Sequence, residues 1–227
     1  MKLGVLFSGG KDSTLALYKA KKDGNEISCL LSLMSKNKES YMFHTPNVHL
    51  TKMQAKSLGI PLMQRKTEGK KEEELKDIIA IIKDARKKYH IEGIVTGAVA
   101  SKYQFDRIKK ICDDLNLKSI NPLWQKNQIE LLNELLQNKF QVIISGVFAY
   151  PLDEKFLGKQ MDASVIQKLG DLQEKYQINP SGEGGEIETT VLDCPLFNKK
   201  IKIIESSVKY ENYAGIFQIK KAKLVEK

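Results

Sequence analysis

The chain has 227 residues, enough for one main domain and a smaller second one. Hydrophobic residues make up 41% and charged residues 29%, which is usual for globular proteins and excludes a disordered or fibrous chain. No apolar run approaches the roughly 20 residues of a membrane helix, so we expect no membrane association. The cysteines, Cys29, Cys112 and Cys194, form no CxxC pair, which fits neither a disulfide scaffold nor a zinc site and favours a cytoplasmic location.

Basic residues outnumber acidic ones, giving a formal charge of +9. Such an excess favours an anionic partner, for example a nucleotide or RNA. The basic residues are scattered in small groups, mostly within amphipathic helical patterns. Two interpretations stay open: solvated helix faces, which the scatter favours, and an RNA-binding surface, which usually has aromatic residues between the charges.

Strands and helices alternate regularly in the first half of the sequence. The predicted strands cover residues 3–7, 27–34, 60–63, 94–96 and 117–120. The predicted helices cover residues 13–22, 46–58, 71–89 and 102–115, and Gly59 is expected to end the second one. This alternation predicts a doubly wound α/β domain, in which helices cover both faces of a parallel sheet.

The alternation weakens after Pro122. Helices are predicted at residues 129–138 and 163–176, and strands at residues 141–147, 187–192, 199–205 and 216–219. We therefore predict a first domain over residues 1–122, which contains the parallel sheet, and a smaller α+β domain over residues 123–227. The strand at 141–147 could instead join the main sheet.

A glycine-rich turn, SGGKDS at residues 8–13, separates the first strand from the first helix. Glycines allow close approach to a phosphate, and the following helix N-terminus presents N–H donors to an anion. Lys11 adds a positive charge, and Asp12 beside an anion site suggests Mg²⁺ that bridges the phosphates. The turn does not match a Walker A loop, because Asp12 takes the Ser/Thr position. The predicted phosphate-binding residues are Ser8, Gly9, Gly10, Lys11, Asp12 and Ser13, and we call this turn the phosphate loop.

SGGKDS resembles the signature of the N-type ATP pyrophosphatases, the PP-loop superfamily. The resemblance implies an adenine nucleotide alpha hydrolase-like, Rossmann-like fold and cleavage of ATP between its α and β phosphates. This chemistry adenylates an acceptor oxygen, and a nitrogen or sulfur nucleophile then displaces AMP. Adenylation makes physical sense for a carboxylate, since it supplies the leaving group that a poor electrophile lacks. Lys11 and Asp12 are therefore predicted to be catalytic as well as nucleotide-binding.

Further stretches are similar to the diphthine–ammonia ligase family in an archaeal-style short form, over nearly the whole chain. They are MFHTPN (42–47), GAV (97–99) with Ser101, Tyr103, Gln104 and Arg107, Cys112, PLW (122–124), FLG (156–158), GEGGEIET (182–189) and DCPLF (193–197). Ile187 and Thr190 depart mildly from the family pattern. The resemblance implies the last step of diphthamide synthesis. In this step the carboxylate of diphthine, a modified histidine of translation elongation factor 2, becomes an amide at the expense of ATP and ammonium.

Diphthine carries a trimethylammonium group, and aromatic faces and carboxylates ordinarily recognise such cations. The aromatic candidates are Tyr103, Trp124, Tyr150 and Tyr213. We expect the GEGGEIET segment to close over the phosphate loop, where its carboxylates would hold the substrate cation or ammonium as it loses a proton. Glu183, Glu186 and Glu188 are therefore predicted to be catalytic. A solvated turn before a strand is the alternative for this segment.

Ligands of open α/β sheets bind beyond the carboxyl ends of the strands, near the switch in strand order. Ser32 and Met34 are therefore predicted to lie near adenine, and Thr96, Gly97 and Ala98 near the ribose and α-phosphate. The predicted substrate contacts are His44, Ser101, Tyr103, Gln104, Arg107 and Trp124. Arg107 could instead be a surface helix charge, and His44 a capping or packing residue.

Two other functions share the phosphate loop: a PP-loop enzyme that modifies tRNA, and a non-catalytic ATP-binding sensor. A thiolase of the first kind would need reactive cysteines. A homo-oligomer is possible, and a nucleic-acid partner is disfavoured but open.

Overall fold

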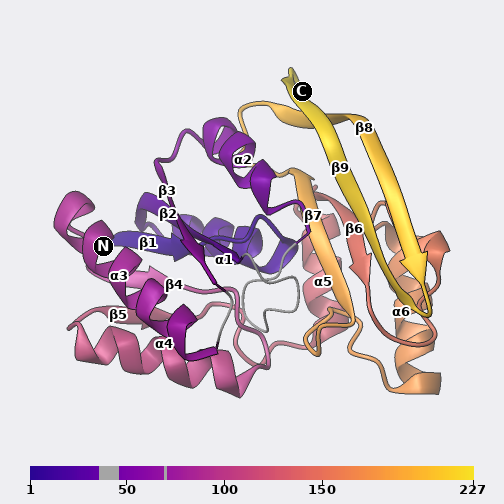
Figure 1. The fold of residues 1–227 in the computed structure, drawn as a ribbon, viewed down its shortest axis with the longest axis horizontal. Helices are drawn as coiled ribbons and strands as arrows, with labels where there is room; N and C mark the ends of the chain where they lie inside the picture. Colours follow the sequence, from indigo (N-terminus) through magenta and orange to yellow (C-terminus); the bar gives the residue numbers. More distant parts are fainter. Residues whose placement is uncertain (36–45, 69–70) are drawn as a thin grey trace.

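The computed structural model describes residues 1–35, 46–68 and 71–227. It contains a five-stranded parallel sheet, built by the N-terminal half, beside a four-stranded antiparallel sheet, built by the C-terminal half (Figure 1). The predicted combination of a doubly wound α/β unit and a smaller α+β unit is confirmed. No helix of the described residues is long and apolar enough to span a membrane.

The parallel sheet has the strand order β3-β2-β1-β4-β5. Its strands are β1 (Lys2–Leu6), β2 (Glu26–Ser35), β3 (Leu62–Thr67), β4 (Gly93–Val95) and β5 (Lys118–Ile120). The helices between them are α1 (Lys11–Lys22), α2 (Thr51–Leu58), α3 (Lys71–Tyr89) and α4 (Lys102–Asp114), and a short 3₁₀ helix, η1 (Val48–Leu50), precedes α2. The chain moves outward from β1 to β3 and then crosses to β4, so the strand order switches between β1 and β4.

Both faces of this sheet are covered by helices, because successive strand residues point to opposite sides. Leu31 and Ile94 pack in one buried cluster with residues of α3 and α4. Their chain neighbours Leu30 and Val95 pack in another with residues of α1 and α2. The near-continuous apolar strands of the sequence are thereby explained.

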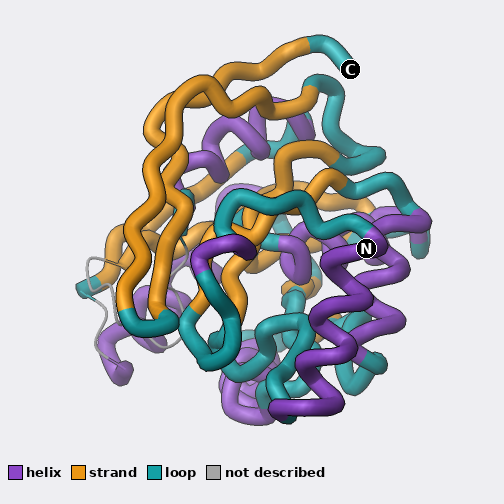
Figure 2. Tube along the Cα trace, turned by 90° about the vertical axis from the view of Figure 1, so that its right-hand side faces the viewer, coloured by secondary structure: helices purple, strands orange, loops and turns teal. Residues whose placement is uncertain are grey.

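The antiparallel sheet has the order β7-β6-β9-β8. Its strands are β6 (Gln141–Val147), β7 (Ile187–Asp193), β8 (Lys200–Glu211) and β9 (Ala214–Val225). The helices of this half are α5 (Gln128–Gln137), α6 (Ala163–Tyr176) and the short 3₁₀ helix η2 (Glu154–Phe156). The alternative placement of residues 141–147 in the main sheet is wrong, because β6 pairs with β7 and β9. The long β8–β9 hairpin runs along one side of the molecule to its turn at residues 212–213 (Figure 2).

Several predicted boundaries were wrong, and three of them have a clear physical reason. The strand predicted from residue 60 begins at Leu62, after Pro61, which has no N–H to contribute to the sheet. The helix predicted from residue 46 begins at Thr51, after the left-handed Asn47 and η1. The strand predicted at residues 216–219 lies in the first half of the twelve-residue β9, and the exposed lysines that follow it interrupt the apolar pattern.

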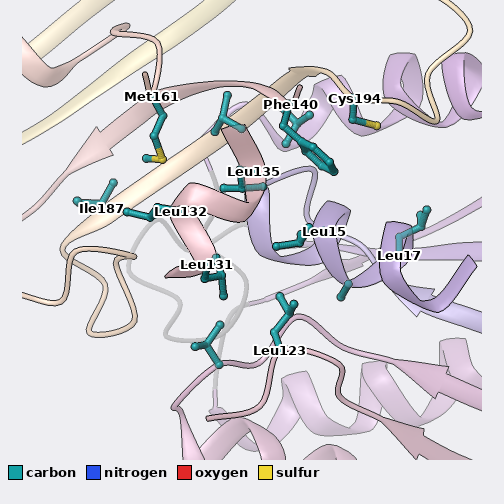
Figure 3. Packing of buried hydrophobic residues seen from close by; sticks show 14 of the residues in the cluster. Leu15, Leu17, Leu123, Leu131, Leu132, Leu135, Phe140, Met161, Ile187 and Cys194 are labelled. Carbon is teal, nitrogen blue, oxygen red and sulfur yellow. The ribbon is translucent and has the colours of Figure 1, made fainter. Parts of the chain in front are cut away.

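One hydrophobic core joins the two sheets (Figure 3). It contains Leu15 and Leu17 of α1, Leu131 of α5, and Ile187 and Val191 of β7. The two halves therefore pack as one body, and the predicted division at residue 122 falls within a continuous core. That division stays a prediction.

Candidate functional site

The SGGKDS loop leaves the end of β1 and forms the start of α1, beside the switch in strand order. α1 begins at Lys11, two residues earlier than predicted, with Gly10 as its N-cap. The hydroxyls of Ser8 and Ser13 lie 3.2 Å apart across the turn, and the Ser8 hydroxyl accepts a 3.3 Å bond from the Gly10 N–H. The predicted phosphate-binding residues thus form one tight turn at a helix N-terminus, which suits an anion.

Close packing explains why glycine is needed in and near this turn. Gly9 has a φ of +81°, and a Cβ there would lie 2.2 Å from Oε1 of Gln54 on α2. A Cβ on Gly97, just after β4, would lie 2.6 Å from the carbonyl carbon of Asp12. The loop after β4 therefore lies directly against the N-terminus of α1, which brings Thr96, Gly97 and Ala98 to the phosphate loop.

Lys11 links the phosphate loop to the C-terminal half. Its side chain is only 2% exposed, and its ammonium donates to Asp12 Oδ2 at 2.6 Å and to the main-chain carbonyl of Ser181 at 2.5 Å. Its backbone N–H donates to Thr189 Oγ1 at 3.1 Å. An ammonium has three donors, so one remains for a ligand.

Asp12 offers an oxygen to a cation. Oδ2 bonds Lys11, whereas Oδ1 is buried and makes no hydrogen bond with any described residue. Among residues 1–35, 46–68 and 71–227, no group of three or more His, Cys, Asp or Glu side chains could hold a metal by itself. These observations fit Mg²⁺, which ordinarily takes one or two carboxylates and binds substrate phosphates and water for the rest.

The glycine-rich segment of residues 179–186 closes on itself through two consecutive turns. The Gly182 N–H donates to the Asn179 carbonyl at 2.8 Å, and the Gly185 N–H to the Gly182 carbonyl at 2.9 Å. Glu186 completes the closure, since its carboxylate accepts from Asn179 Nδ2 at 2.7 Å and from the Gly184 N–H at 2.8 Å. Gly184 and Gly185 are exposed, as the alternative of a solvated turn before a strand expects, whereas Ser181 beside them is buried and bonds Lys11.

Two other carboxylates, Glu183 of this segment and Glu188 just after it, lie close to the phosphate loop. Glu183 Oε2 accepts a 2.8 Å bond from the Ala100 N–H, which ties the segment to the loop after β4. Burial and the nearby Asp12 raise the pKa of Glu183. Burial also raises the pKa of Glu188, on β7, to about 8; Asp12 adds to this shift, and Lys11 opposes it. Glu183 and Glu188 therefore share the electrostatic surroundings of Lys11 and Asp12, whereas Glu186 is occupied within its own segment.

The residues predicted to surround adenine lie at the end of β2. Ser32 is 1% exposed, and its hydroxyl has no hydrogen-bond partner among the described residues. Met34 Sδ lies 3.6 Å from Gln64 Nε2. Thr96 bonds the Asn121 side chain and accepts a 3.3 Å bond from the Ala98 N–H, which shapes the loop after β4. Their contacts with a nucleotide stay predictions.

The predicted substrate residues Ser101, Tyr103, Gln104 and Arg107 lie at the start of α4. Ser101 caps this helix and accepts from the Gln104 N–H at 3.4 Å. The Arg107 guanidinium lies 3.4 Å from the Tyr103 ring centre, and its Nε is buried without a hydrogen bond to any described residue, so Arg107 is not a freely solvated charge.

The aromatic candidates fall into two groups. Trp124 stacks on Phe105 of α4 with the ring centres 4.1 Å apart, whereas Tyr150 and Tyr213 pack on each other as exposed side chains. His44 lies outside the described residues.

Gln54, Gln128 and Ser181, which sequence reasoning missed, hold the site together. Gln54, 1% exposed, donates through one amide nitrogen to the carbonyls of Gly9 at 2.9 Å and Val191 at 2.8 Å. Gln128 accepts from Ser181, which in turn holds Lys11. These contacts join residues at least 45 positions apart, and no local sequence signal could have indicated them.

Basic residues do gather in one place outside the phosphate loop. A groove of about 670 Å³ lies between α2 and β9. It is lined by His49, Leu50, Lys52, Met53, Lys56, Lys220, Lys221, Ala222 and Leu224. The interpretation of the positive charge as scattered helix faces is therefore incomplete, and a nucleic-acid partner stays an open prediction.

The cysteines are not arranged for reaction. All of them are buried and free, as predicted for Cys194. Burial raises the pKa of Cys29 to about 12 and those of Cys112 and Cys194 to about 11. These thiols carry almost no thiolate at neutral pH, contrary to the needs of a cysteine-dependent thiolase.

Comparison with known proteins defines the class of this phosphate-loop protein. Residues 1–119 match the family model "Diphthamide synthase N-terminal domain", and residues 127–225 match "Diphthamide synthase C-terminal domain". The chain therefore belongs to the diphthamide synthase family. The diphthine–ammonia ligase of Bos taurus is 36% identical, with 96% of this chain and 88% of that protein covered. The Homo sapiens diphthine–ammonia ligase is also 36% identical, with 91% and 84% covered.

Among solved structures, the chain is similar to a predicted subunit of tRNA methyltransferase from Methanocaldococcus jannaschii. That chain is 19% identical, with 86% of this chain and 98% of that one covered. The TM-score of 0.44 is too low to indicate a shared activity.

Proposed function

We propose that this protein is an ATP-dependent diphthine–ammonia ligase. It adenylates the carboxylate of diphthine on translation elongation factor 2, releases pyrophosphate, and forms the amide when ammonia displaces AMP. Family membership supports the acceptor, and the phosphate loop supports the use of ATP. The single observation that carries the proposal is the meeting of Lys11 with Ser181 and Thr189, which brings the acidic segment of one half onto the phosphate loop of the other.

The phosphate loop binds the ATP phosphates in this proposal. Ser8, Gly9, Gly10 and Ser13 supply hydroxyl and backbone donors, and Lys11 uses its third N–H. Asp12 would hold Mg²⁺ through Oδ1, and the ion would neutralise charge on the departing pyrophosphate. Ser32 and Met34 lie beside adenine, and Thr96, Gly97 and Ala98 beside the ribose and α-phosphate.

Glu188 is the group we assign to proton transfer from ammonium. When ionised, its carboxylate accepts a proton from ammonium, and the resulting ammonia attacks the acyl carbon as the bond to AMP breaks. A pKa of about 8 makes Glu188 a better base than an ordinary glutamate near neutral pH. Glu183 lies near the same part of the site, and the hydrogen bond that it accepts from the Ala100 N–H positions the glycine-rich segment.

The acceptor approaches from the α4 side in this proposal. Arg107 pairs with the substrate carboxylate, and Tyr103 and Trp124 offer aromatic surface to the trimethylammonium group. Ser101, Gln104 and His44 remain predicted contacts. The reaction would take place in the cytoplasm, and a homo-oligomer is possible.

The test uses the purified chain with Mg-ATP, ammonium and diphthine-bearing elongation factor 2. AMP, pyrophosphate and the mass change from acid to amide are measured. Product that requires both the factor and ammonium supports the ligase. AMP formed only with tRNA would indicate an RNA-modifying enzyme, and tight ATP binding without turnover would indicate a sensor.

A further inference from the structure

The ammonium of Lys11 depends on a main-chain group for its position. A lysine side chain is long and flexible, so its charge has a defined place only where partners hold it. One partner is the neighbouring Asp12, and the other is the carbonyl of Ser181, on the segment between α6 and β7. Whatever fixes Ser181 therefore also fixes Lys11.

Gln128 holds Ser181 through two bonds to a single oxygen. Its Oε1 accepts from the Ser181 N–H at 3.0 Å and from the Ser181 hydroxyl at 2.7 Å. Ser181 is 2% exposed, so water cannot readily replace these bonds. Together they constrain both the backbone and the side chain of Ser181, and with them the direction of its carbonyl.

Gln128 is itself well anchored. It is the first residue of α5, whose N-cap Asn127 accepts from two backbone N–H groups, and α5 is held in the core by Leu131 and Leu135. The other half of its amide donates to Asn179 Oδ1 at 3.0 Å. Asn179 in turn donates to Glu186. The glutamine thus joins a rigid helix to the glycine-rich segment with both ends of its amide.

We propose that Gln128 is a positioning residue for nucleotide binding: through Ser181 it sets the Lys11 ammonium at the phosphate loop. The inference rests on the proposed function only in taking the ligand of this loop to be a nucleoside triphosphate with Mg²⁺. Gln128 need not touch the nucleotide. It acts through two intervening contacts, Gln128 to Ser181 and Ser181 to Lys11.

A binding cycle tests the inference without any need for the acceptor. The affinity of the full chain for Mg²⁺ and an ATP analogue with a methylene α–β bridge is measured by calorimetry. The variants are Gln128→Ala, Lys11→Ala and the double variant, with Gln137→Ala, an exposed position on α5, as the matched control. We expect Gln128→Ala to weaken binding roughly tenfold in the wild-type background. It should add almost nothing in the Lys11→Ala background, because two residues that act through the same series of contacts do not have additive effects. Gln137→Ala should bind like the wild type.

A second variant separates positioning from general loosening of the fold. Gln128→Glu keeps an oxygen for both Ser181 donors but loses the donor to Asn179, so it should bind within roughly threefold of the wild type. Wild-type affinity in Gln128→Ala, or an equal loss in the two Lys11 backgrounds, would overturn the inference. So would an equal loss in Gln128→Ala and Gln128→Glu. If the wild type binds the analogue but makes no amide, the acceptor assignment fails and the positioning role stands.

Discussion

The phosphate loop and the glycine-rich segment of residues 179–186 look alike in composition, yet they are held in place differently. The phosphate loop is shaped by its surroundings, with Gln54 and Gly97 pressed against it. The glycine-rich segment combines both kinds of contact: Glu186 closes it from within, whereas Gln128 and Ala100 bond it from outside. The phosphate loop can therefore keep a donor for a ligand, whereas the segment offers its remaining groups, Glu183 and the Ser181 carbonyl, to partners in the other half of the chain.

The largest effect expected is that of removing the charge of the phosphate loop. Lys11→Ala should lower AMP formation by about 100-fold or more, because no other described cation contacts Asp12 in this loop. Lys21→Ala, an exposed change on the same helix, serves as the control in the same assay. AMP formation within twofold of the wild type would remove Lys11 from the mechanism.

Two glycines of the glycine-rich segment, Gly182 and Gly185, form a matched pair that tests how closely this segment packs. Gly182 and Gly185 both have positive φ, but an added Cβ would lie 2.3 Å from the Ile187 carbonyl oxygen at Gly182 and in open space at Gly185. Both substitutions should cost about 1 kcal/mol of unfolding free energy for the left-handed backbone. Gly182→Ala should cost about 1–3 kcal/mol more from the clash. Denaturant unfolding measures the difference, and equal costs would contradict the packing described for Gly182.

The pH dependence of the reaction tests Glu188. Because only the ionised carboxylate accepts a proton, we expect the wild-type rate to rise through about pH 8. Glu188→Gln should lose this component and about 100-fold in rate with ammonium. Hydroxylamine, a nucleophile already unprotonated at neutral pH, controls for the availability of ammonia. The variant should recover with hydroxylamine, and an equal defect with both nucleophiles would contradict the assignment.

Glu188 should also affect stability with a defined sign. Its folded pKa of about 8 exceeds the ordinary value of 4.5, so the folded state binds the proton more tightly than the unfolded state. Its stabilising contribution is complete below about pH 4.5 and is lost as the pH rises through about 8. Glu188→Gln should flatten this part of the stability profile, measured by denaturant unfolding at a series of pH values.

The smallest effect is expected for Glu186→Gln. An amide can accept on its oxygen side only, so it loses one of the bonds from Asn179 or Gly184, at a cost of about 1–2 kcal/mol. Amide formation should fall only a few-fold. A loss as large as that of Lys11→Ala would show that Glu186 reacts directly, and no change in rate or substrate affinity would remove it from the site altogether.

The sequence predicted the parallel sheet better than the antiparallel one. Strands such as β2 and β4 are buried on both faces, and their apolar runs are unambiguous. β8 and β9 are interrupted by exposed polar residues, among them Lys202, Lys209 and Lys220, so only short parts looked like strands. The partner strand of residues 141–147 could not be predicted, because pairing depends on contacts distant in sequence.

The site divides in the same way. The local sequence was sufficient to predict the SGGKDS turn as a phosphate-binding site, since a strand, a glycine turn and a helix are adjacent in the chain. The approach of Glu183 and Glu188 was expected from an acidic, glycine-rich run in an otherwise basic chain, although that pattern does not specify which carboxylate approaches the loop. Gln54 and Gln128 gave no signal, because a polar residue at the start of a helix or on its face looks like an ordinary surface residue until its distant partner is known.

The continuous core has a consequence for the way this chain can be divided. The family models match it as two pieces, residues 1–119 and 127–225, which invites their separate expression. The first piece alone would expose Leu15 and Leu17, and the second would expose Leu131 and Ile187, which in the intact chain share one buried cluster. The pieces therefore resemble the subunits of an obligate heterodimer, and each should need the other, produced in the same cell, to remain folded.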